Sequence, residues 1–207
     1  MAVTALASEV HSPRFRFVAG DSCLGDGRIL YGGSFDPPHL GHRAILVALL
    51  RLFPSAAISM IPAHTHAFGK ELQDYERRLG WCRDVANDLS SRIEVSDVER
   101  SLDGSSLATV RYFRAQEPER RLIWVIGSDL VDSLPRWRGA SSLANLVEFC
   151  VFRRVGSSVD PGILVDSEAM PDVSSTELRE ALAVGMIRGS ALPEVLKTTF
   201  LKDNPYL

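Results

Sequence analysis

The 207-residue chain has few cysteines, no long apolar run and no excess of basic residues. Its three cysteines, Cys23, Cys82 and Cys150, are widely separated and form no C-x-x-C pair, which argues against a disulfide framework and a zinc ribbon. No apolar run approaches the roughly 18 residues of a membrane-spanning helix, and residues 1–20 lack the apolar centre of a signal peptide. We therefore expect a cytoplasmic protein with no membrane partner, in which Cys82 and Cys150 are reduced core thiols.

The charge balance argues against nucleic acid as a partner. The chain carries 23 Lys and Arg against 26 Asp and Glu, for a net charge of −3, so any affinity for phosphate must be local. A hydrophobic content of 45% suits one domain with a full-sized core. We expect residues 28–207 to form that domain and residues 1–27, which show no sustained period, to form a poorly ordered N-terminal extension. Within it, only residues 14–18 alternate as a short strand does.

Apolar runs and helical patterns alternate from residue 28 onward. We expect strands at 29–31, 56–61, 93–95, 122–126, 147–152 and 163–165. We expect helices at 44–53, from the N-cap Asp74 to Leu89, from an N-cap at Ser105 or Ser106 to about residue 114, near 130–134 and 143, and at 174–184 and 193–200. This alternation predicts a doubly wound, Rossmann-like α/β fold, with a mostly parallel sheet and helices on both faces. In such sheets ligands bind beyond the carboxyl ends of the strands.

The stretch from Ile29 to His42 predicts a strand, a tight turn and a helix start at that edge. Gly32 and Gly33 lack a Cβ, so a ligand can approach the bare backbone there. An anion at the following helix N-terminus would meet unsatisfied N–H donors and the positive end of the helix dipole. His39 and His42 are three residues apart and face the same way on a helix. Together these features predict a phosphate-handling site.

A second stretch, from Val173 to Arg179, predicts a helix that begins with a capping box. Ser174 is the N-cap candidate, and Glu177 follows it by three residues. Arg179 adds a cation with a planar fork of donors one turn into a helix start rich in hydroxyls. Two such helix N-termini would suit a nucleoside triphosphate.

Both stretches resemble signatures of a known family. Residues 32–42, GGSFDPPHLGH, resemble the G-x-F-D-P-x-H-x-G-H signature of the nucleotidyltransferases. Residues 174–179, SSTELR, resemble the S-S-T-x-I/L-R signature of their nicotinate (or nicotinamide) mononucleotide adenylyltransferase branch. Gly127 to Asp129 with Trp137 are similar to that branch's G-x-D…W segment, and residues 192–207 to its C-terminal helix and tail.

The resemblance implies transfer of AMP from ATP to nicotinate mononucleotide, which yields deamido-NAD and pyrophosphate in NAD biosynthesis. No covalent enzyme intermediate is needed, so catalysis rests on alignment and on stabilisation of charge. Three alternatives stay open: the same reaction on nicotinamide mononucleotide, a relative using another acceptor such as pantetheine phosphate or a sugar or alcohol phosphate, and a non-catalytic nucleotide-binding regulator. The serine-rich second signature argues against the second alternative, and the presence of His39, His42 and Arg179 argues against the third.

The resemblance also implies roles for individual residues. His39, His42 and Arg179 form the catalytic set, with His42 nearest the α-phosphate. The expected ATP-binding residues are Gly32, Gly33, Ser34, Phe35, Gly127, Asp129 (through a ribose hydroxyl), Ser174, Ser175 and Thr176. We expect Mg²⁺ to be carried on the triphosphate, since the sequence has no compact carboxylate cluster. A protein zinc site that combines His64 and His66 with His39 and His42 is disfavoured, because no H-E-x-x-H-type pattern is present.

The expected contacts to the mononucleotide are Lys70, Ser105, Ser106 and Trp137. Lys70 ends a His-Ala-Phe-Gly-Lys segment where many branch members have Pro-His-Lys, and it is either a phosphate contact or an ordinary exposed lysine. The backbone N–H groups of Ser105 and Ser106 can bind a carboxylate, but the branch often has Ser-Tyr-Thr here, and the missing tyrosine weakens a preference for acid over amide. Trp137 either stacks on a pyridine ring or is a half-buried loop residue.

The remaining arginines and tryptophans have simpler expected roles. We expect the pairs Arg77-Arg78 and Arg120-Arg121 to lie on solvated faces or to interact with helix dipoles. We expect Trp81 and Trp124 in the core. Arg153 or Arg154 either flanks the nucleotide or belongs to a solvated pair. The expected partners are therefore small-molecule substrates, and the sequence leaves open whether the chain forms a homo-oligomer.

Overall fold

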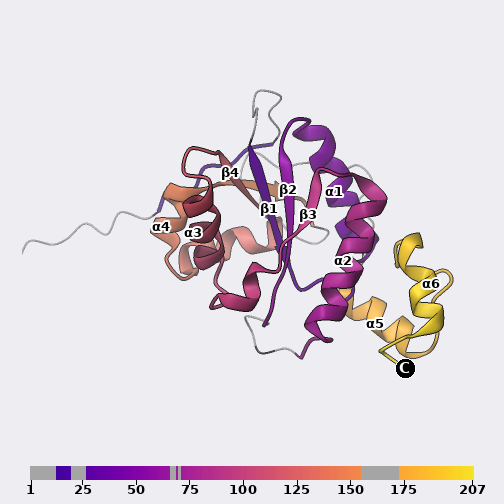
Figure 1. The fold of residues 1–207 in the computed structure, drawn as a ribbon. Coiled ribbons are helices and arrows are strands. Elements are labelled where there is room, and N and C mark those ends of the chain that lie inside the picture. Colours follow the sequence, from indigo (N-terminus) through magenta and orange to yellow (C-terminus); the bar gives the residue numbers. More distant parts are fainter. Residues whose placement is uncertain (1–12, 20–26, 66–68, 70, 155–172) are drawn as a thin grey trace, which may run out of the picture.

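A sheet of parallel strands lies at the centre of the computed structural model, which describes residues 13–19, 27–65, 69, 71–154 and 173–207. Within these residues five strands are ordered β3-β2-β1-β4-β5, and every neighbouring pair is parallel (Figure 1). The strands are β1 (Arg28–Gly33), β2 (Ala57–Pro62), β3 (Ile93–Val95), β4 (Leu122–Gly127) and β5 (Glu148–Phe152). The strand expected at 163–165 lies outside the described residues.

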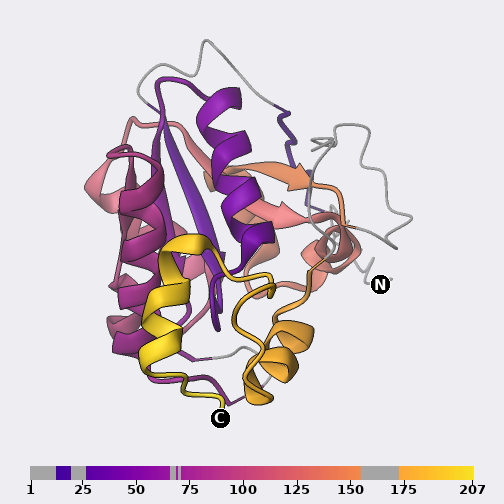
Figure 2. The same cartoon turned by 90° about the vertical axis from the view of Figure 1, so that its right-hand side faces the viewer.

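Helices cover both faces of this sheet, which confirms the predicted doubly wound fold. The helices α1 (Leu40–Leu52) and α2 (Tyr75–Leu89) lie on one face, and α3 (Ser106–Gln116) and α4 (Ala140–Leu146) lie on the other (Figure 1). The C-terminal helices α5 (Ser175–Ala183) and α6 (Glu194–Lys202) lie on the same side as α1 and α2 (Figure 2). Two 3₁₀ helices, η1 (Val98–Ser101) and η2 (Ser128–Arg136), connect strands to helices. No helix of the described residues is long and apolar enough to cross a membrane.

The helix starts follow local capping, as the sequence predicts. Asp74 Oδ1 accepts the N–H of Arg77 at 3.0 Å, and Ser105 Oγ accepts the N–H of Ala108 at 3.2 Å. The apolar pattern from Ala44 covers only part of the first helix: α1 begins at Leu40 with His39 as its N-cap. The two histidines therefore lie at the start of this helix, as the sequence predicts.

The core has two parts, one on each face of the sheet. Successive residues of β1 point to opposite faces, so Ile29 and Tyr31 join the cluster under α1 and α2, whereas Leu30 joins the cluster under α3 and α4. The predicted core residues are confirmed: Trp81, Trp124, Cys82 and Cys150 are all buried.

The described residues of the N-terminal part of the chain contact strand β5 of the sheet. Phe17 forms a parallel bridge to Phe149 of β5, and the rings of Phe15 and Phe17 lie 5.5 Å and 6.2 Å from the ring of Phe149, centre to centre. The segment therefore lies along the edge of β5. The division of the chain at residue 28 stays a prediction.

The strand order reverses at β1, which has β2 on one side and β4 on the other. The carboxyl ends of β1 and β4 therefore flank the crevice in which open α/β sheets bind their ligands. Gly32 and Gly33 end β1, and Gly127 ends β4. The topology brings together two of the motifs singled out in the sequence.

Candidate active site

The helix α1 begins with two histidines that cap each other. The N–H of His42 donates to Nδ1 of His39 at 3.4 Å, and the N–H of His39 donates to Nδ1 of His42 at 3.2 Å. Their rings stack with centroids 3.7 Å apart and planes 25° apart, which confirms that the two residues face the same way. Because each Nδ1 accepts a hydrogen bond, the single proton of each neutral ring is assigned to Nε2.

Burial keeps both imidazoles neutral in the unliganded protein. It lowers the pKa of His39 to about 4, and the positive charge of Arg154 acts in the same direction. Burial lowers the pKa of His42 well below its usual value, with smaller effects from His39 and Arg154. At neutral pH the pair therefore offers two Nε2–H donors without a positive charge. A bound polyphosphate would stabilise the charged form and raise both pKa values.

Backbone groups of the first turn of α1 already have internal partners. The N–H of Leu40 donates to the carbonyl of Ala191 at 2.8 Å, and the N–H of His42 is used by His39. The open helix mouth expected from the sequence is therefore partly filled by the chain itself. The helix dipole still favours negative charge at this end. Two donors that remain for an anion are the imidazole Nε2–H groups of His39 and His42.

The loop between β1 and α1 is shaped by a buried aromatic ring. Phe35 has a φ of +47°, which costs a non-glycine residue about 1–3 kcal/mol. Its ring packs edge-on against His42 with centroids 4.8 Å apart. A Cβ at Gly33 would lie 3.0 Å from this ring, and one at Gly32 would lie 3.1 Å from the ring of Trp124. A Cβ at either glycine would therefore require the neighbouring ring to shift by a few tenths of an ångström.

The start of α5 is joined to the same loop by Arg179. The predicted capping box is confirmed, since Ser174 and Glu177 exchange side-chain and backbone hydrogen bonds at 3.1 Å. Arg179 donates through Nη1 to the carbonyl of Asp36 at 2.9 Å and through Nη2 to Oγ1 of Thr176 at 3.2 Å. Residues far apart in sequence, the histidine pair and the start of α5, therefore lie at one edge of the sheet.

The carboxyl end of β4 places Asp129 beside Arg154. The Nε of Arg154 lies 3.7 Å from Oδ1 of Asp129, and the backbone N–H of Arg154 donates to Oγ of Ser128 at 2.9 Å. A Cβ at Gly127 would overlap Oδ1 of Asp129 and crowd Arg154. Glycine is therefore required at Gly127 for Asp129 to keep this position. Arg154 also lowers the pKa of both histidines, so its charge reaches the histidine pair.

One residue of the C-terminal tail contacts one residue of the β1–α1 loop, and the sequence patterns did not single out this contact. The hydroxyl of Tyr206 donates to Oδ1 of Asp36 at 2.6 Å. The Asp36 side chain is only 2% exposed, and its Oδ2 accepts the N–H of Gln73 at 3.4 Å. The buried carboxylate thus joins the loop to the tail.

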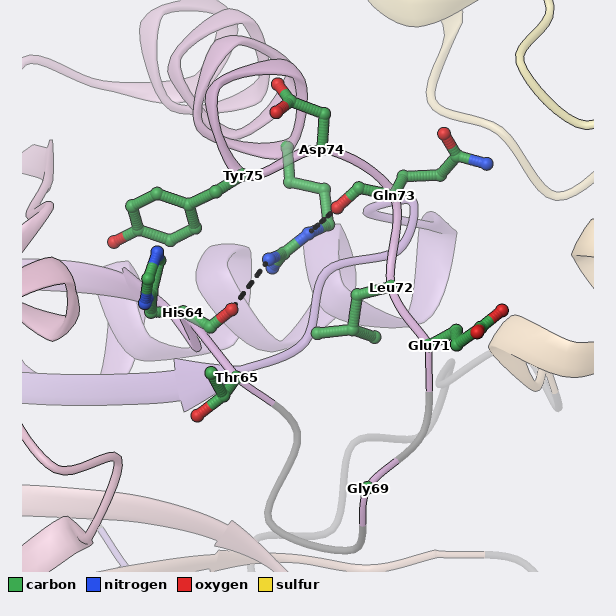
Figure 3. A pocket seen from close by; sticks show the side chains of 9 residues that line it. His64, Thr65, Gly69, Glu71, Leu72, Gln73, Asp74 and Tyr75 are labelled. Carbon is green, nitrogen blue, oxygen red and sulfur yellow. Dashed lines mark hydrogen bonds between the residues drawn. The ribbon is translucent and has the colours of Figure 1, made fainter.

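The prediction that Arg78 lies on a solvated face is wrong, because its side chain is only 1% exposed. Its guanidinium donates at 2.8 Å to three backbone carbonyls, those of Gln73, Ser34 and Ala63. It also lies 3.5 Å from the carbonyl of His64, and Figure 3 marks the interactions with Gln73 and His64 as dashed lines. It therefore clamps the segments that follow β1 and β2. A signal was present in the sequence, since Arg78 falls on the buried stripe of α2 at helical spacing from Tyr75 and Cys82.

A cavity of about 470 Å³ lies beside this clamp at the carboxyl end of β2. Figure 3 shows the residues around it; they are His64, Thr65, Gly69, Glu71, Leu72, Gln73, Asp74, Tyr75 and Arg78. The rings of His64 and Tyr75 meet edge-on at 4.7 Å. The Tyr75 hydroxyl is buried and has no hydrogen-bond partner among the described residues.

The residues expected to contact the mononucleotide lie around the start of α3. The N–H and hydroxyl of Ser105 both donate to Oδ1 of Asp103, at 3.0 Å and 2.6 Å, so this amide is already engaged. Asp103 in turn pairs with Arg138 at 2.7 Å. Trp137 is half-buried, and its Nε1–H donates to Oγ of Ser133 at 2.9 Å. Ser106 is the first residue of α3.

Part of the expected site cannot be placed. Lys70 and His66 lie outside the described residues, and so their expected roles stay predictions. The ligand contacts of the other expected residues also stay predictions, although the structure brings His39, His42, Phe35 and Arg179 together.

The sheet order, together with the histidine pair and the glycine turns at its switch point, defines an α/β protein of the Rossmann-like class with a candidate anion site at the start of α1. Residues 30–181 match the family model described as cytidylyltransferase-like. A protein of Anaeromyxobacter dehalogenans (strain 2CP-C) is 33% identical over 174 residues, which cover 81% of this chain and 90% of that protein. One of Shouchella clausii is 33% identical over 162 residues, which cover 75% and 84%. Both are named "probable nicotinate-nucleotide adenylyltransferase".

The fold is also shared with a solved structure, that of Plasmodium falciparum nicotinic acid mononucleotide adenylyltransferase complexed with NaAD. The TM-score is 0.73 at 20% identity, and the match covers 87% of this chain and 97% of the other. The chain therefore belongs to the cytidylyltransferase-like family and, within it, to the nicotinate-nucleotide adenylyltransferases, which are nucleotidyltransferase enzymes.

Proposed function

We propose that the chain transfers AMP from ATP to the 5′-phosphate of nicotinate mononucleotide and forms deamido-NAD and pyrophosphate. The observation that carries this proposal is the pair of neutral, buried imidazoles at the start of α1, joined to Arg179 through the loop that contains Asp36. The names of the relatives and the NaAD complex of the Plasmodium protein support the same reaction.

The proposed chemistry is an in-line displacement at the α-phosphorus of ATP. An oxygen of the mononucleotide phosphate forms the new P–O bond, while the bond to the bridging oxygen breaks and pyrophosphate leaves. Negative charge shifts onto the phosphoryl oxygens, where preorganised donors are most effective. The Nε2–H groups of His39 and His42 supply such donors, with His42 nearest the α-phosphate.

The start of α5 is proposed to hold the β- and γ-phosphates. A guanidinium has five N–H donors, so Arg179 can keep its bonds to Asp36 and Thr176 and still bind a phosphate oxygen. Ser175 adds donors at the positive end of the helix dipole. The N–H and hydroxyl of Ser174 both donate to Oε2 of Glu177, at 3.1 Å and 2.9 Å, so a phosphate contact at Ser174 would replace one of these bonds. The backbone from Gly32 to Phe35 and at Gly127, together with Asp129 at a ribose hydroxyl, would complete the ATP site.

The mononucleotide is proposed to lie between the start of α3 and Trp137. Since Asp103 already engages the amide of Ser105, we assign the larger part of carboxylate binding to Ser106 at the helix N-terminus. Trp137 would stack on the pyridine ring and Lys70 would contact the phosphate.

Mg²⁺ is proposed to enter on the triphosphate. Among the described residues, no group of three or more His, Cys, Asp or Glu side chains is placed to hold a metal ion, and phosphate oxygens with water are the usual ligands of Mg²⁺. The ion would neutralise phosphate charge, while the residues named above orient the reacting groups.

A substrate panel tests the proposal. The chain is incubated with ATP, Mg²⁺ and one acceptor, and both pyrophosphate and the dinucleotide product are measured. We expect turnover with nicotinate mononucleotide at a kcat/KM above that with nicotinamide mononucleotide. Turnover of pantetheine phosphate alone would support the runner-up reaction, and no turnover with either pyridine mononucleotide would refute the proposal.

A further inference from the structure

The last residues of the chain reach back to the loop between β1 and α1. The Tyr206 ring stacks parallel to that of Phe200 with centroids 6.2 Å apart. The side-chain amide of Gln73 donates to the carbonyl of Pro205 at 3.2 Å, and that of Asn204 donates to the carbonyl of Leu182 at 2.7 Å. The tail is thus anchored on α5, on α6 and on the segment before α2.

The Tyr206 hydroxyl makes the shorter of two hydrogen bonds to the buried carboxylate of Asp36. It lies 2.6 Å from Oδ1 of Asp36, whereas the N–H of Gln73 lies 3.4 Å from Oδ2. A buried carboxylate is costly without hydrogen bonds, so the position of Asp36 depends on this hydroxyl. Burial and the hydrogen bond to Asp36 both raise the pKa of Tyr206, which keeps the phenol protonated as a donor.

Asp36 connects the tail to the groups proposed to act on the triphosphate. Its carbonyl accepts a hydrogen bond from Arg179, and the residue before it, Phe35, packs against His42. Phe35 is held at a positive φ, a conformation that persists only when its surroundings enforce it. A shift of Asp36 therefore displaces both Arg179 and the ring that supports His42.

We propose that Tyr206 is a positioning residue for adenylyl transfer, because its hydroxyl fixes the Asp36 carboxylate and with it the β1–α1 loop. This inference rests on the proposed function. Tyr206 acts through Asp36 and needs no contact with substrate. Its loss therefore affects the alignment of the reacting groups more than the binding of either substrate.

The test is the substitution Tyr206→Phe, which removes the hydroxyl and keeps the ring against Phe200. We expect kcat to fall by about 10- to 100-fold, as a small misalignment of reacting groups does, with the KM of each substrate changed by less than about threefold. The matched control is Tyr112→Phe, on the 42% exposed tyrosine of α3, which should keep the kcat of the unchanged chain. Thermal unfolding is followed for both variants.

The outcomes separate the two proposals. No turnover by the unchanged chain would overturn both of them. Turnover by the unchanged chain, with a folded Tyr206→Phe variant whose kcat is within about twofold of it, would overturn only the role of Tyr206. If Tyr206→Phe does not fold at the assay temperature, Gln73→Ala takes its place. That variant loosens the tail at Pro205 and should lower kcat in the same way, and an unchanged kcat would overturn the inference.

A double-mutant cycle with Asp36→Asn tests the route through Asp36. Residues that act as one unit give strongly non-additive effects. We expect Tyr206→Phe to lower kcat by less than about twofold in the Asp36→Asn background. Two independent effects that multiply would show that Tyr206 acts elsewhere and would overturn the proposed route.

Discussion

Replacing Arg78 with Met should lower the free energy of unfolding by about 4.5 kcal/mol, because it removes three charge-assisted hydrogen bonds worth about 1.5 kcal/mol each. Met keeps most of the aliphatic stem in the core, so the change isolates the guanidinium. The three bonds at 2.8 Å join the carbonyls of Ser34, Ala63 and Gln73. Without the donor these carbonyls lie in a buried region with fewer partners, which adds to the loss.

Urea unfolding of the purified chain measures this loss. The matched control is Arg77→Met, at the neighbouring position, where the side chain is 36% exposed and pairs with Asp203 at 3.1 Å. An exposed pair of this kind contributes about 1 kcal/mol or less. We expect a clear drop in the urea midpoint at an unchanged m-value for Arg78→Met alone. Equal, small losses of unfolding free energy for the two variants would refute the claim that Arg78 holds the segments after β1 and β2 together.

Two further predictions concern pH and the end of β4. The pKa of His39 is lowered to about 4 in the folded chain, against about 6.5 in an unfolded one. Between these two pKa values the unfolded chain binds more protons than the folded one. The free energy of unfolding therefore falls as the pH falls from about 6.5 to about 4. Between pH 7 and pH 5 the free energy of unfolding lost through His39 is about 2 kcal/mol. Urea unfolding of His39→Asn should therefore show a free energy of unfolding that falls by about 2 kcal/mol less over this range than that of the unchanged chain. An equal dependence in both proteins would contradict the lowered pKa. Gly127→Ala would place a Cβ against Asp129, and we expect the KM for ATP to rise about tenfold with a smaller change in kcat; an unchanged KM would argue against a ribose contact at Asp129.

The elements of the fold could be predicted from sequence because their signals are local. Strand β4 is a continuous apolar run, as expected of a strand buried on both faces. The caps Asp74, Ser105 and Ser174 each act on an amide three residues ahead. At α1 the apolar period from Ala44 marks only part of the helix, and the spacing of His39 and His42 indicates its first turn.

Contacts between distant residues could not be predicted in this way. The bond between Tyr206 and Asp36 joins residues 170 positions apart, and no local pattern encodes it. The positive φ of Phe35 arises from the packing around it, and nothing in the residue type favours it. Arg78 shows a different failure, because charge suggested exposure although its place on the buried stripe of α2 indicated the core.

The central claim is that a neutral imidazole at His42 donates a hydrogen bond to the reacting phosphate. The most direct measurement is the kcat of His42→Asn with ATP, Mg²⁺ and nicotinate mononucleotide. The Asn side-chain oxygen can still accept the N–H of His39, so the change preserves the cap and removes the Nε2–H donor. We predict a loss in kcat of about 10²-fold or more, the effect of removing a donor that acts in the transition state. A kcat close to that of the unchanged chain would contradict the account.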